Sequence, residues 1–277
     1  MKQEPLLIQY QTLRSATNEL FNVLGVGMGY VIRTRENHLV VIDGGNPEDG
    51  EKFLQLLCDL SDGMPQVTHW FITHPHSDHY GALMTICCDP VLLARLKIGE
   101  IVFSVPERDF VDVRNHVYAP MVDELNEILW RTNAVHTVPS SGDVFEVDGM
   151  RIEIVTTWRD LEEVIDPNDT STALMVDAYG TRILILGDSY DAAAANAVRN
   201  FGDRLKCDIC QIAHHGLRGG SIELYERADP AIWLLPSNRA TMQAFRGKYP
   251  ANAWVYDHAR DLRVMGDGML ALPLPLR

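Results

Sequence analysis

Hydrophobic residues recur along the chain with two periods, which together predict a fold of mixed strands and helices. Helical spacing of apolar residues predicts helices at 51–60, 79–88, 110–131, 191–200 and 222–227. Short apolar or alternating runs predict strands at 20–24, 30–32, 39–42, 67–72, 144–147, 151–156, 172–178, 182–186, 207–213, 231–235, 254–256, 262–264 and 269–272. These strands fall into two groups, 6–73 and 144–272, each interleaved with helices. Two sheets packed face to face, with helices outside, would bury such a pattern.

Length and composition favour one large domain. The 277 residues are 46% hydrophobic, which is enough to build a sizeable core. No linker rich in Pro, Gly or Ser and no run of charge divides the sequence. The motifs described below span residues 43–215, so a boundary between them would break the site. We therefore predict a single domain over 1–277.

The charge and the apolar runs limit the partners and the location of the protein. A formal net charge of −14 makes long nucleic acid an unfavourable ligand. Small anionic substrates are compatible with this charge, because bound metal ions invert the local field. The chain opens on no secretory signal, and no window approaches the roughly 20 apolar residues of a membrane span. We expect a soluble cytoplasmic protein with no membrane partner.

The five cysteines have no spacing typical of a disulfide framework, which fits a reducing compartment. Cys207 and Cys210 have C-x-x-C spacing, but they lie in the predicted strand 207–213. Alternation there would point their side chains to opposite faces. We therefore interpret both as core residues and not as a metal clip or a redox pair.

The richest chemistry lies in the run from Thr73 to His79, directly after the predicted strand 67–72. It places His74, His76, Asp78 and His79 within six residues, a density of metal-ligating groups that a core would not tolerate unpaired. In an extended loop His74 and His76 project to the same side. Asp78 and His79 then turn into the next helix and can face a second ion.

Three further motifs stand in order along the chain: Asp43-Gly44-Gly45, Gly187-Asp188 and His214-His215-Gly216. Asp188 follows an apolar run and is placed to bridge two ions. Of the histidine pair, one is expected to bind metal and the other to contact substrate, with His215 the favoured ligand. Two divalent cations about 3.5–4 Å apart would supply the nucleophile and the positive field that hydrolysis at neutral pH needs. The four sites together predict a dinuclear metal centre.

These motifs resemble those of the metallo-β-lactamase superfamily from about residue 18 to the end of the chain. The H-x-H-x-D-H run at 74–79 is the most specific mark, and 41–45 and 186–189 match the flanking aspartate motifs. Three segments, 208–216, 168–174 and 237–239, are similar to the branch of competence DNA-uptake domains and phosphorylcholine esterases. The resemblance implies an α/β fold of the four-layer αββα type and hydrolysis of phosphodiester-like bonds. The implied cofactors are two divalent metal ions, zinc in first place, with manganese or iron as alternatives.

The resemblance also implies roles for single residues. It assigns the first metal to His74, His76, Asp188 and a histidine of the 214–215 pair, and the second to Asp78, His79 and Asp188. Asp43 would support the site through hydrogen bonds without ligating metal. Many members of the wider superfamily have a histidine at the position of Asn168. The closer branch has an asparagine there, as this chain does. That branch often has a histidine after Asn-Arg, which is missing here after Arg239. His258 could replace it, or the second metal is held weakly or completed by substrate.

We therefore expect a metal-dependent hydrolase that cleaves a small phosphodiester or related anionic ester. A metal-bound hydroxide, oriented by Asp78 or Asp188 as catalytic residues, would attack in line. A lactonase or thioesterase on the same fold is the first alternative. A relative in which metal only braces the fold is the second.

Overall fold

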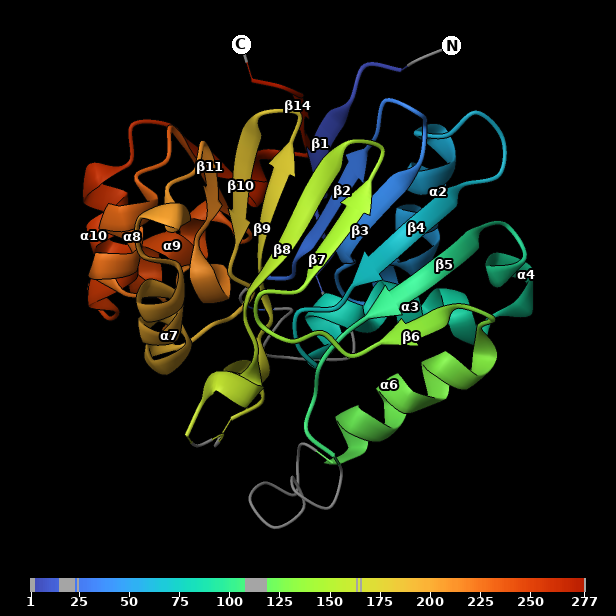
Figure 1. Ribbon diagram of the computed structural model, residues 1–277, viewed down its shortest axis with the longest axis horizontal. Coiled ribbons are helices and arrows are strands. Elements are labelled where there is room, and N and C mark those ends of the chain that lie inside the picture. The colour runs from blue at the N-terminus through green and yellow to red at the C-terminus, as the bar shows by residue number, and fades with distance from the viewer. Residues whose placement is uncertain are drawn as a thin grey trace.

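The computed structural model describes residues 3–14, 23, 25–107, 119–162, 164 and 166–276. Over these residues the strands form two seven-stranded sheets that pack face to face, with helices on both outer surfaces (Figure 1). This is the expected αββα sandwich. Both ends of the described chain lie at the same edge of the molecule (Figure 1).

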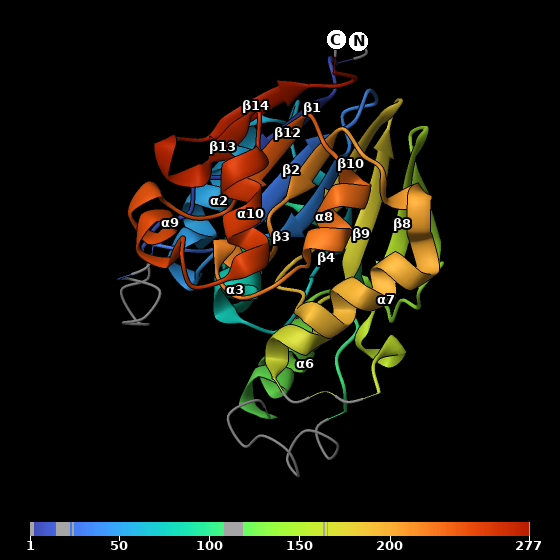
Figure 2. The ribbon, with the colours of Figure 1, turned by 90° about the vertical axis from the view of Figure 1, so that its left-hand side faces the viewer.

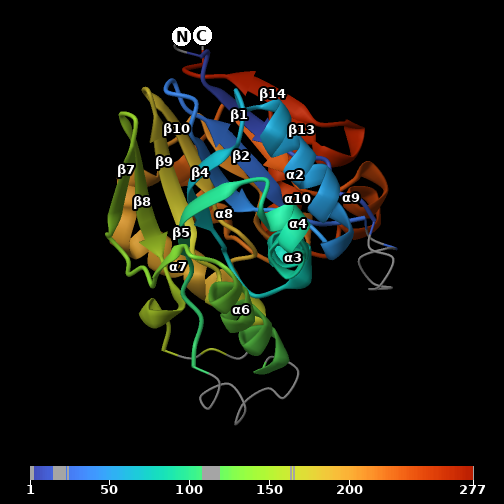
Figure 3. The ribbon, with the colours of Figure 1, turned by 90° about the vertical axis from the view of Figure 1, so that its right-hand side faces the viewer.

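The first sheet contains the N-terminal strands and one C-terminal strand. Its order is β14 (Leu270–Pro273), β1 (Leu6–Gln9), β2 (Gly29–Arg33), β3 (Leu39–Asp43), β4 (Gln66–Phe71), β5 (Lys97–Val102) and β6 (Val135–Thr137). From β3 to β6 the strands run parallel. Its outer face carries α2 (Gly50–Asp59), α3 (Ser77–Cys88), α4 (Pro90–Leu93) and α6 (Ala119–Arg131), as Figure 3 shows.

The second sheet contains the remaining C-terminal strands. Its order is β13 (Leu262–Val264), β12 (Ile232–Leu235), β11 (Ile209–Gln211), β10 (Thr181–Ile185), β9 (Ala173–Ala178), β8 (Met150–Thr156) and β7 (Val144–Val147). From β10 to β13 the strands run parallel. Its outer face carries α7 (Asp191–Phe201), α8 (Ile222–Ala228), α9 (Arg239–Phe245) and α10 (Pro250–His258), as Figure 2 shows. Short 3-10 turns lie at Pro47–Asp49, Trp158–Asp160, Pro167–Thr170, Gly202–Leu205, Ala213–Gly216 and Met265–Asp267.

Alternation along the strands explains the layers. In β3, Val40 and Ile42 face the second sheet, whereas Leu39 and Val41 face the helices of the first sheet. All four side chains are fully buried. A strand that is apolar on both faces suits the middle of a sheet covered on both sides. No helix in the described ranges is long and apolar enough to cross a membrane.

Two strand predictions at the C-terminal end are wrong. Residues 254–256 lie in α10, which begins with Pro250 in its first turn. Three residues are too few to distinguish a strand period from a helical one. The predicted grouping of all strands from 144 to 272 in one sheet is also wrong. β14 (Leu270–Pro273) pairs antiparallel with β1 and therefore belongs to the first sheet. The predicted strand over 20–24 lies outside the described residues apart from residue 23, and so does the helix over 110–118.

The strand predicted at 207–213 is shorter, and the argument about its cysteines is wrong. β11 covers only Ile209–Gln211, because the chain turns at Ala213–Gly216. Cys207 precedes the strand, so alternation does not separate it from Cys210, and both lie in the outer core of the second sheet. Burial and then the neighbouring Cys207 raise the pKa of the Cys210 thiol. Both are free, buried thiols, as expected for core residues. The sequence prediction also missed β5, which is exposed or half-exposed over its first four residues, and the edge strand β6, which has no buried residue.

Candidate metal centre

The predicted metal-binding motifs meet where parallel strands of both sheets end. Asp43 closes β3, and the segment from Thr73 to His79 connects β4 to α3. Asp188 follows β10, and His214 and His215 follow β11. Carboxyl ends of parallel strands are where loops of an α/β fold converge to form a site. Gly187 (φ 57°) permits a close approach between the two halves, because a Cβ there would lie 2.9 Å from the Thr73 Cβ.

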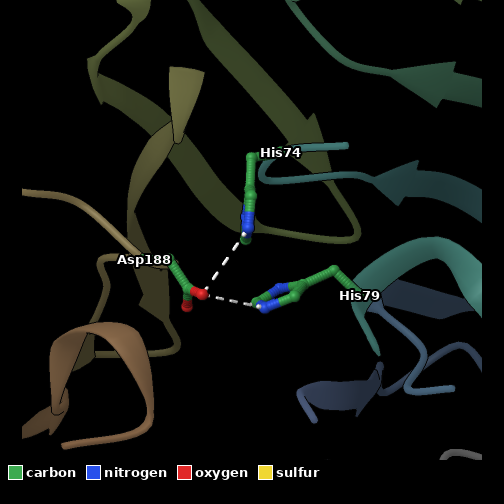
Figure 4. Close-up of side chains that lie close together, drawn as sticks. All are labelled: His74, His79 and Asp188. Carbon is green, nitrogen blue, oxygen red and sulfur yellow. Dashed lines mark ion pairs between the residues drawn. The ribbon is translucent and has the colours of Figure 1, made fainter. Parts of the chain in front are cut away.

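Asp188 is the centre of the cluster. Its Oδ2 lies 3.5 Å from Nε2 of His74 and 3.4 Å from Nε2 of His79, and the three side chains point toward one another (Figure 4). The same oxygen lies 3.3 Å from Nε2 of His215 and 3.8 Å from Nε2 of His214. One carboxylate oxygen therefore faces four imidazoles that come from both sheets.

The donor atoms form two overlapping groups, His74–His79–Asp188 and Asp78–His79–His215. Within each group the donor atoms lie within 4.8 Å of one another, and all of these residues are buried. His76 extends the first group, with its Nδ1 2.9 Å from Nε2 of His74.

The histidine pair differs from the sequence expectation. We expected a histidine of the pair, with His215 favoured, beside His74 and His76. The structure instead places His215 Nε2 3.1 Å from Asp78 Oδ2 and 3.2 Å from His79 Nε2. His214 and His215 both have left-handed backbone conformations (φ 49° and 54°), and their ring centroids lie 6.0 Å apart. The turn therefore directs two consecutive imidazoles to different parts of the cluster.

Hydrogen bonds outside the cluster orient three of the rings. Nδ1 of His79 lies 2.7 Å from Asp43 Oδ2, and Nδ1 of His215 lies 2.8 Å from the Pro236 carbonyl oxygen. Nδ1 of His214 lies 2.5 Å from the carbonyl oxygen of Arg218. A ring that donates from Nδ1 keeps the lone pair of Nε2 for a metal ion. Asp43 contacts a candidate ligand and is not part of either donor group.

Burial and charge shift the pKa values of the cluster in opposite directions. Burial and the neighbouring His79 lower the pKa of His74, which keeps this imidazole neutral. Burial alone would lower the pKa of His79, but Asp188 and two further carboxylates hold it well above its usual value. Burial would also lower the pKa of His215, yet Asp188 outweighs it and raises this pKa to about 10. The two imidazoles in turn hold the pKa of Asp188 well below its usual range, although burial opposes this.

The donor set fits divalent metal ions. Oδ1 of Asp78 and Oδ1 of Asp188 are buried and have no hydrogen-bond partner among the described residues. A buried carboxylate oxygen without a partner is costly unless an ion satisfies it. Neutral imidazoles and carboxylates are ligands that zinc, manganese and iron accept. The cluster therefore has the chemistry of a metal site.

The remaining candidate residues occupy different places. Asn168 is buried, and its Nδ2 donates to Asp166 Oδ1 (2.7 Å) and to the Tyr190 hydroxyl oxygen (2.9 Å). His258 ends α10, where its exposed ring stacks on Trp254 of the same helix and its Nδ1 lies 2.7 Å from the Trp254 carbonyl oxygen. The structure therefore brings Asn168 toward the site and leaves His258 outside both donor groups.

A groove of about 880 Å³ opens beside the cluster, and sequence reasoning did not find it. Tyr190 lines this groove, and its ring centroid lies 5.3 Å from that of His214. The charged residues of the groove wall are five acids, Asp160, Glu162, Asp166, Asp169 and Asp191, and two bases, Arg199 and Arg218. The only local signal for Tyr190 in the sequence is its position two residues after Asp188.

Comparison with known proteins agrees with this geometry. The sequence model of the family described as the Metallo-beta-lactamase superfamily matches residues 23–228 of this chain. A search of the curated proteins finds no match. Among solved structures, the metallo-beta-lactamase fold protein YhfI from Bacillus subtilis superposes with a TM-score of 0.57 at 11% identity, covering 97% of this chain and 100% of that one. Tm1679, a metal-dependent hydrolase of the beta-lactamase superfamily, gives 0.53 at 13% identity, covering 97% and 99%.

A third similar structure has a different chemistry. CmlA, a diiron beta-hydroxylase from Streptomyces venezuelae, gives a TM-score of 0.57 at 13% identity, covering 99% of this chain and 55% of that one. At these identities the structures establish the fold alone. The match of the family model spans most of the chain and includes the H-x-H-x-D-H run and Asp188. The chain therefore belongs to the metallo-beta-lactamase superfamily.

Proposed function

We propose that this protein is a metal-dependent hydrolase that acts on a small phosphodiester or a related anionic ester. The observation that carries the proposal is the position of Asp188 Oδ2, 3.3–3.5 Å from three imidazole nitrogens. A carboxylate oxygen in that position suits a bridge between two ions. We assign one ion to His74, His76 and Asp188, with His214 next to them, and the other to Asp78, His79, His215 and Asp188.

Two divalent cations, zinc in first place and manganese or iron as alternatives, would supply Lewis acidity and activate water. In this proposal Asp78 and Asp188 are the catalytic residues, because their carboxylates orient the attacking water. Asp43 keeps the imidazole of His79 in the tautomer that binds metal. The burial of these side chains excludes bulk water, which strengthens every electrostatic interaction in the site.

The charge and thiols of the chain support a small substrate and an intracellular site of action. The net charge of −14 disfavours long nucleic acid as the diester. The rest of the substrate would lie in the groove, where Arg199 and Arg218 offer positive charge. All five cysteines are free thiols, which suits the cytoplasm that we propose as the location.

A lactonase or thioesterase activity is the second candidate. The groove wall carries five carboxylates against two arginines, which favours a substrate whose reacting group is neutral. A panel of substrates distinguishes the two activities. Only the first should cleave activated phosphodiesters faster than activated carboxylic esters.

The test is hydrolysis of bis(p-nitrophenyl) phosphate by protein reconstituted with zinc or manganese. We expect Asp188→Asn to lose at least about 100-fold in turnover while the protein stays folded, because the neutral amide no longer bridges two cations. Asp203→Asn is the matched control, because Asp203 is fully exposed and pairs with Arg227. An Asp188→Asn variant with parental activity would overturn the bridging role. An inactive parent that cleaves p-nitrophenyl acetate would favour the second candidate, and tight metal binding without any activity would favour a structural metal.

A further inference from the structure

Tyr190 lies between the groove and the cluster of candidate metal ligands. It follows Asp188 by two residues, and its ring packs against His214 with centroids 5.3 Å apart. Tyr190 also lines the groove together with Arg218, whose guanidinium lies over the Tyr190 ring at 4.6 Å. The phenol therefore stands where a substrate that fills the groove would meet the cluster.

The direction of the Tyr190 hydroxyl is set by Asn168. Asn168 is 4% exposed, and its Nδ2 donates to the Tyr190 oxygen at 2.9 Å and to Asp166 Oδ1 at 2.7 Å. An amide nitrogen only donates, so the phenol oxygen is the acceptor in this bond. Among the described residues none accepts the phenol proton, which leaves it available to a molecule in the groove.

The exposure of the cluster indicates from which side a substrate approaches. His74, His79 and His215 are buried, whereas His76 and His214 are half-buried. The cluster is therefore most exposed at His76 and His214, and Tyr190 packs against the second of these two rings. An in-line displacement puts the attacking water and the leaving group on opposite sides of the phosphorus. With water activated inside the cluster, the leaving group points outward to the groove.

We propose that the Tyr190 hydroxyl donates a hydrogen bond to the leaving-group oxygen of the substrate, and that Asn168 is the positioning residue for this bond. The proposal rests on the proposed hydrolase function. In the step, a bond forms between phosphorus and the oxygen of water while the bond between phosphorus and the leaving oxygen breaks. The electron pair of the broken bond stays on the leaving oxygen, and Tyr190 stabilises the negative charge that develops there while it keeps its own proton. The attacking water releases one proton to solvent, and the departed oxygen later takes up one proton from solvent.

The first test compares two leaving groups on metal-reconstituted protein. Tyr190→Phe removes the hydroxyl and retains the ring that packs on His214. A hydrogen bond to a charged oxygen changes a rate by about 10- to 100-fold. We expect Tyr190→Phe to lower kcat/KM about tenfold for methyl p-nitrophenyl phosphate and about 100-fold for methyl phenyl phosphate, whose leaving oxygen carries more charge. Asn168→Leu should show a smaller loss with the same dependence on the leaving group.

The matched control is Tyr249→Phe, which also removes a tyrosine hydroxyl. Tyr249 directly precedes α10, and its ring stacks on that of Phe245 at the end of α9. This variant should retain the parental kcat/KM with both diesters. Equal losses with the two diesters in Tyr190→Phe would overturn the proposal, because a general defect in folding or metal binding does not depend on the leaving group. Parental activity of Tyr190→Phe would overturn it too.

A second readout does not need turnover. The visible band of p-nitrophenolate moves to shorter wavelength when its oxygen accepts a hydrogen bond. We expect this shift on binding to the parent and to Tyr249→Phe, with a smaller shift and about tenfold weaker binding in Tyr190→Phe. Equal spectra and equal Kd values in the parent and Tyr190→Phe would overturn the proposal. If the parent cleaves neither diester, the hydrolase proposal fails, while the nitrophenolate spectra still decide whether Tyr190 binds an aryl oxide.

Discussion

Asp43 lies at hydrogen-bond distance from Nδ1 of His79, and we expect it to set the tautomer of this ring. This expectation predicts how Asp43→Asn affects metal binding. Asp43 Oδ2 lies 2.7 Å from His79 Nδ1, and Oδ1 accepts the backbone N–H of Thr73 at 2.8 Å. Asp43→Asn keeps the size of the side chain, and its carbonyl oxygen can still accept from Thr73. The new amide nitrogen then donates toward His79 Nδ1, so the ring proton moves to Nε2. That nitrogen is the one that faces Asp188.

The expected loss of metal affinity follows from the free energy that the hydrogen bond between Asp43 and His79 contributes. Removing the partner that orients a metal-binding histidine costs about 10- to 100-fold in metal affinity, which is about 1.4–2.7 kcal/mol. Competition with a chromophoric chelator measures this affinity for Zn²⁺, and urea unfolding of metal-free protein measures the accompanying loss of stability.

The matched control for Asp43→Asn is Asp49→Asn. Asp49 is also a buried carboxylate, and it accepts from the backbone N–H groups of Leu13 and Asn46 and from the Tyr10 hydroxyl. This variant should lose stability and keep the parental metal affinity. Parental affinity in Asp43→Asn, or an equal loss of affinity in both variants, would refute the tautomer argument.

Three further predictions test stability and metal linkage. Burial raises the pKa of Asp49 to about 6 from 3.8, so the folded protein holds this proton more tightly than the unfolded chain. The resulting stability of about 3 kcal/mol is complete below about pH 3.8 and is lost as pH rises through about 6; an unchanged pH slope of urea stability in Asp49→Asn would contradict this. Gly81→Ala puts a Cβ 2.4 Å from the Pro47 backbone nitrogen, which should cost about 1–3 kcal/mol and weaken metal binding. Gly247→Ala should change neither stability nor metal affinity, because a Cβ there has no atom within 4 Å. Chemical denaturation measures the stability of both glycine variants, and chelator competition measures their metal affinity. Removing metal with EDTA should lower the Tm, since metal at about 100 times its Kd adds about 2.7 kcal/mol of stability; an unchanged Tm would argue against a bound ion.

Much of the fold was predictable because its central strands, such as β3 and β10, are largely buried and apolar on both faces. The runs at 39–42 and 182–186 correspond to β3 and β10 within one residue at each end. The edge strand β6 was not predictable, because its residues are half-exposed or exposed and show no apolar pattern. The helix α10 was misjudged over 254–256, because Trp254 and Tyr256 flank the buried Val255 and imitate alternation.

The sequence by itself identified the candidate metal-binding groups and showed that each follows a strand, because these facts depend only on local order along the chain. The tertiary structure decided which candidate ligands lie together in one donor group. It separated His215 from His214 through a left-handed turn and brought Asn168 to Tyr190, 22 residues away. It also paired β14 with β1, although these two strands lie near opposite ends of the sequence. Local periodicity carries no information on such distances, because they depend on strand pairing and on the packing of one sheet against the other.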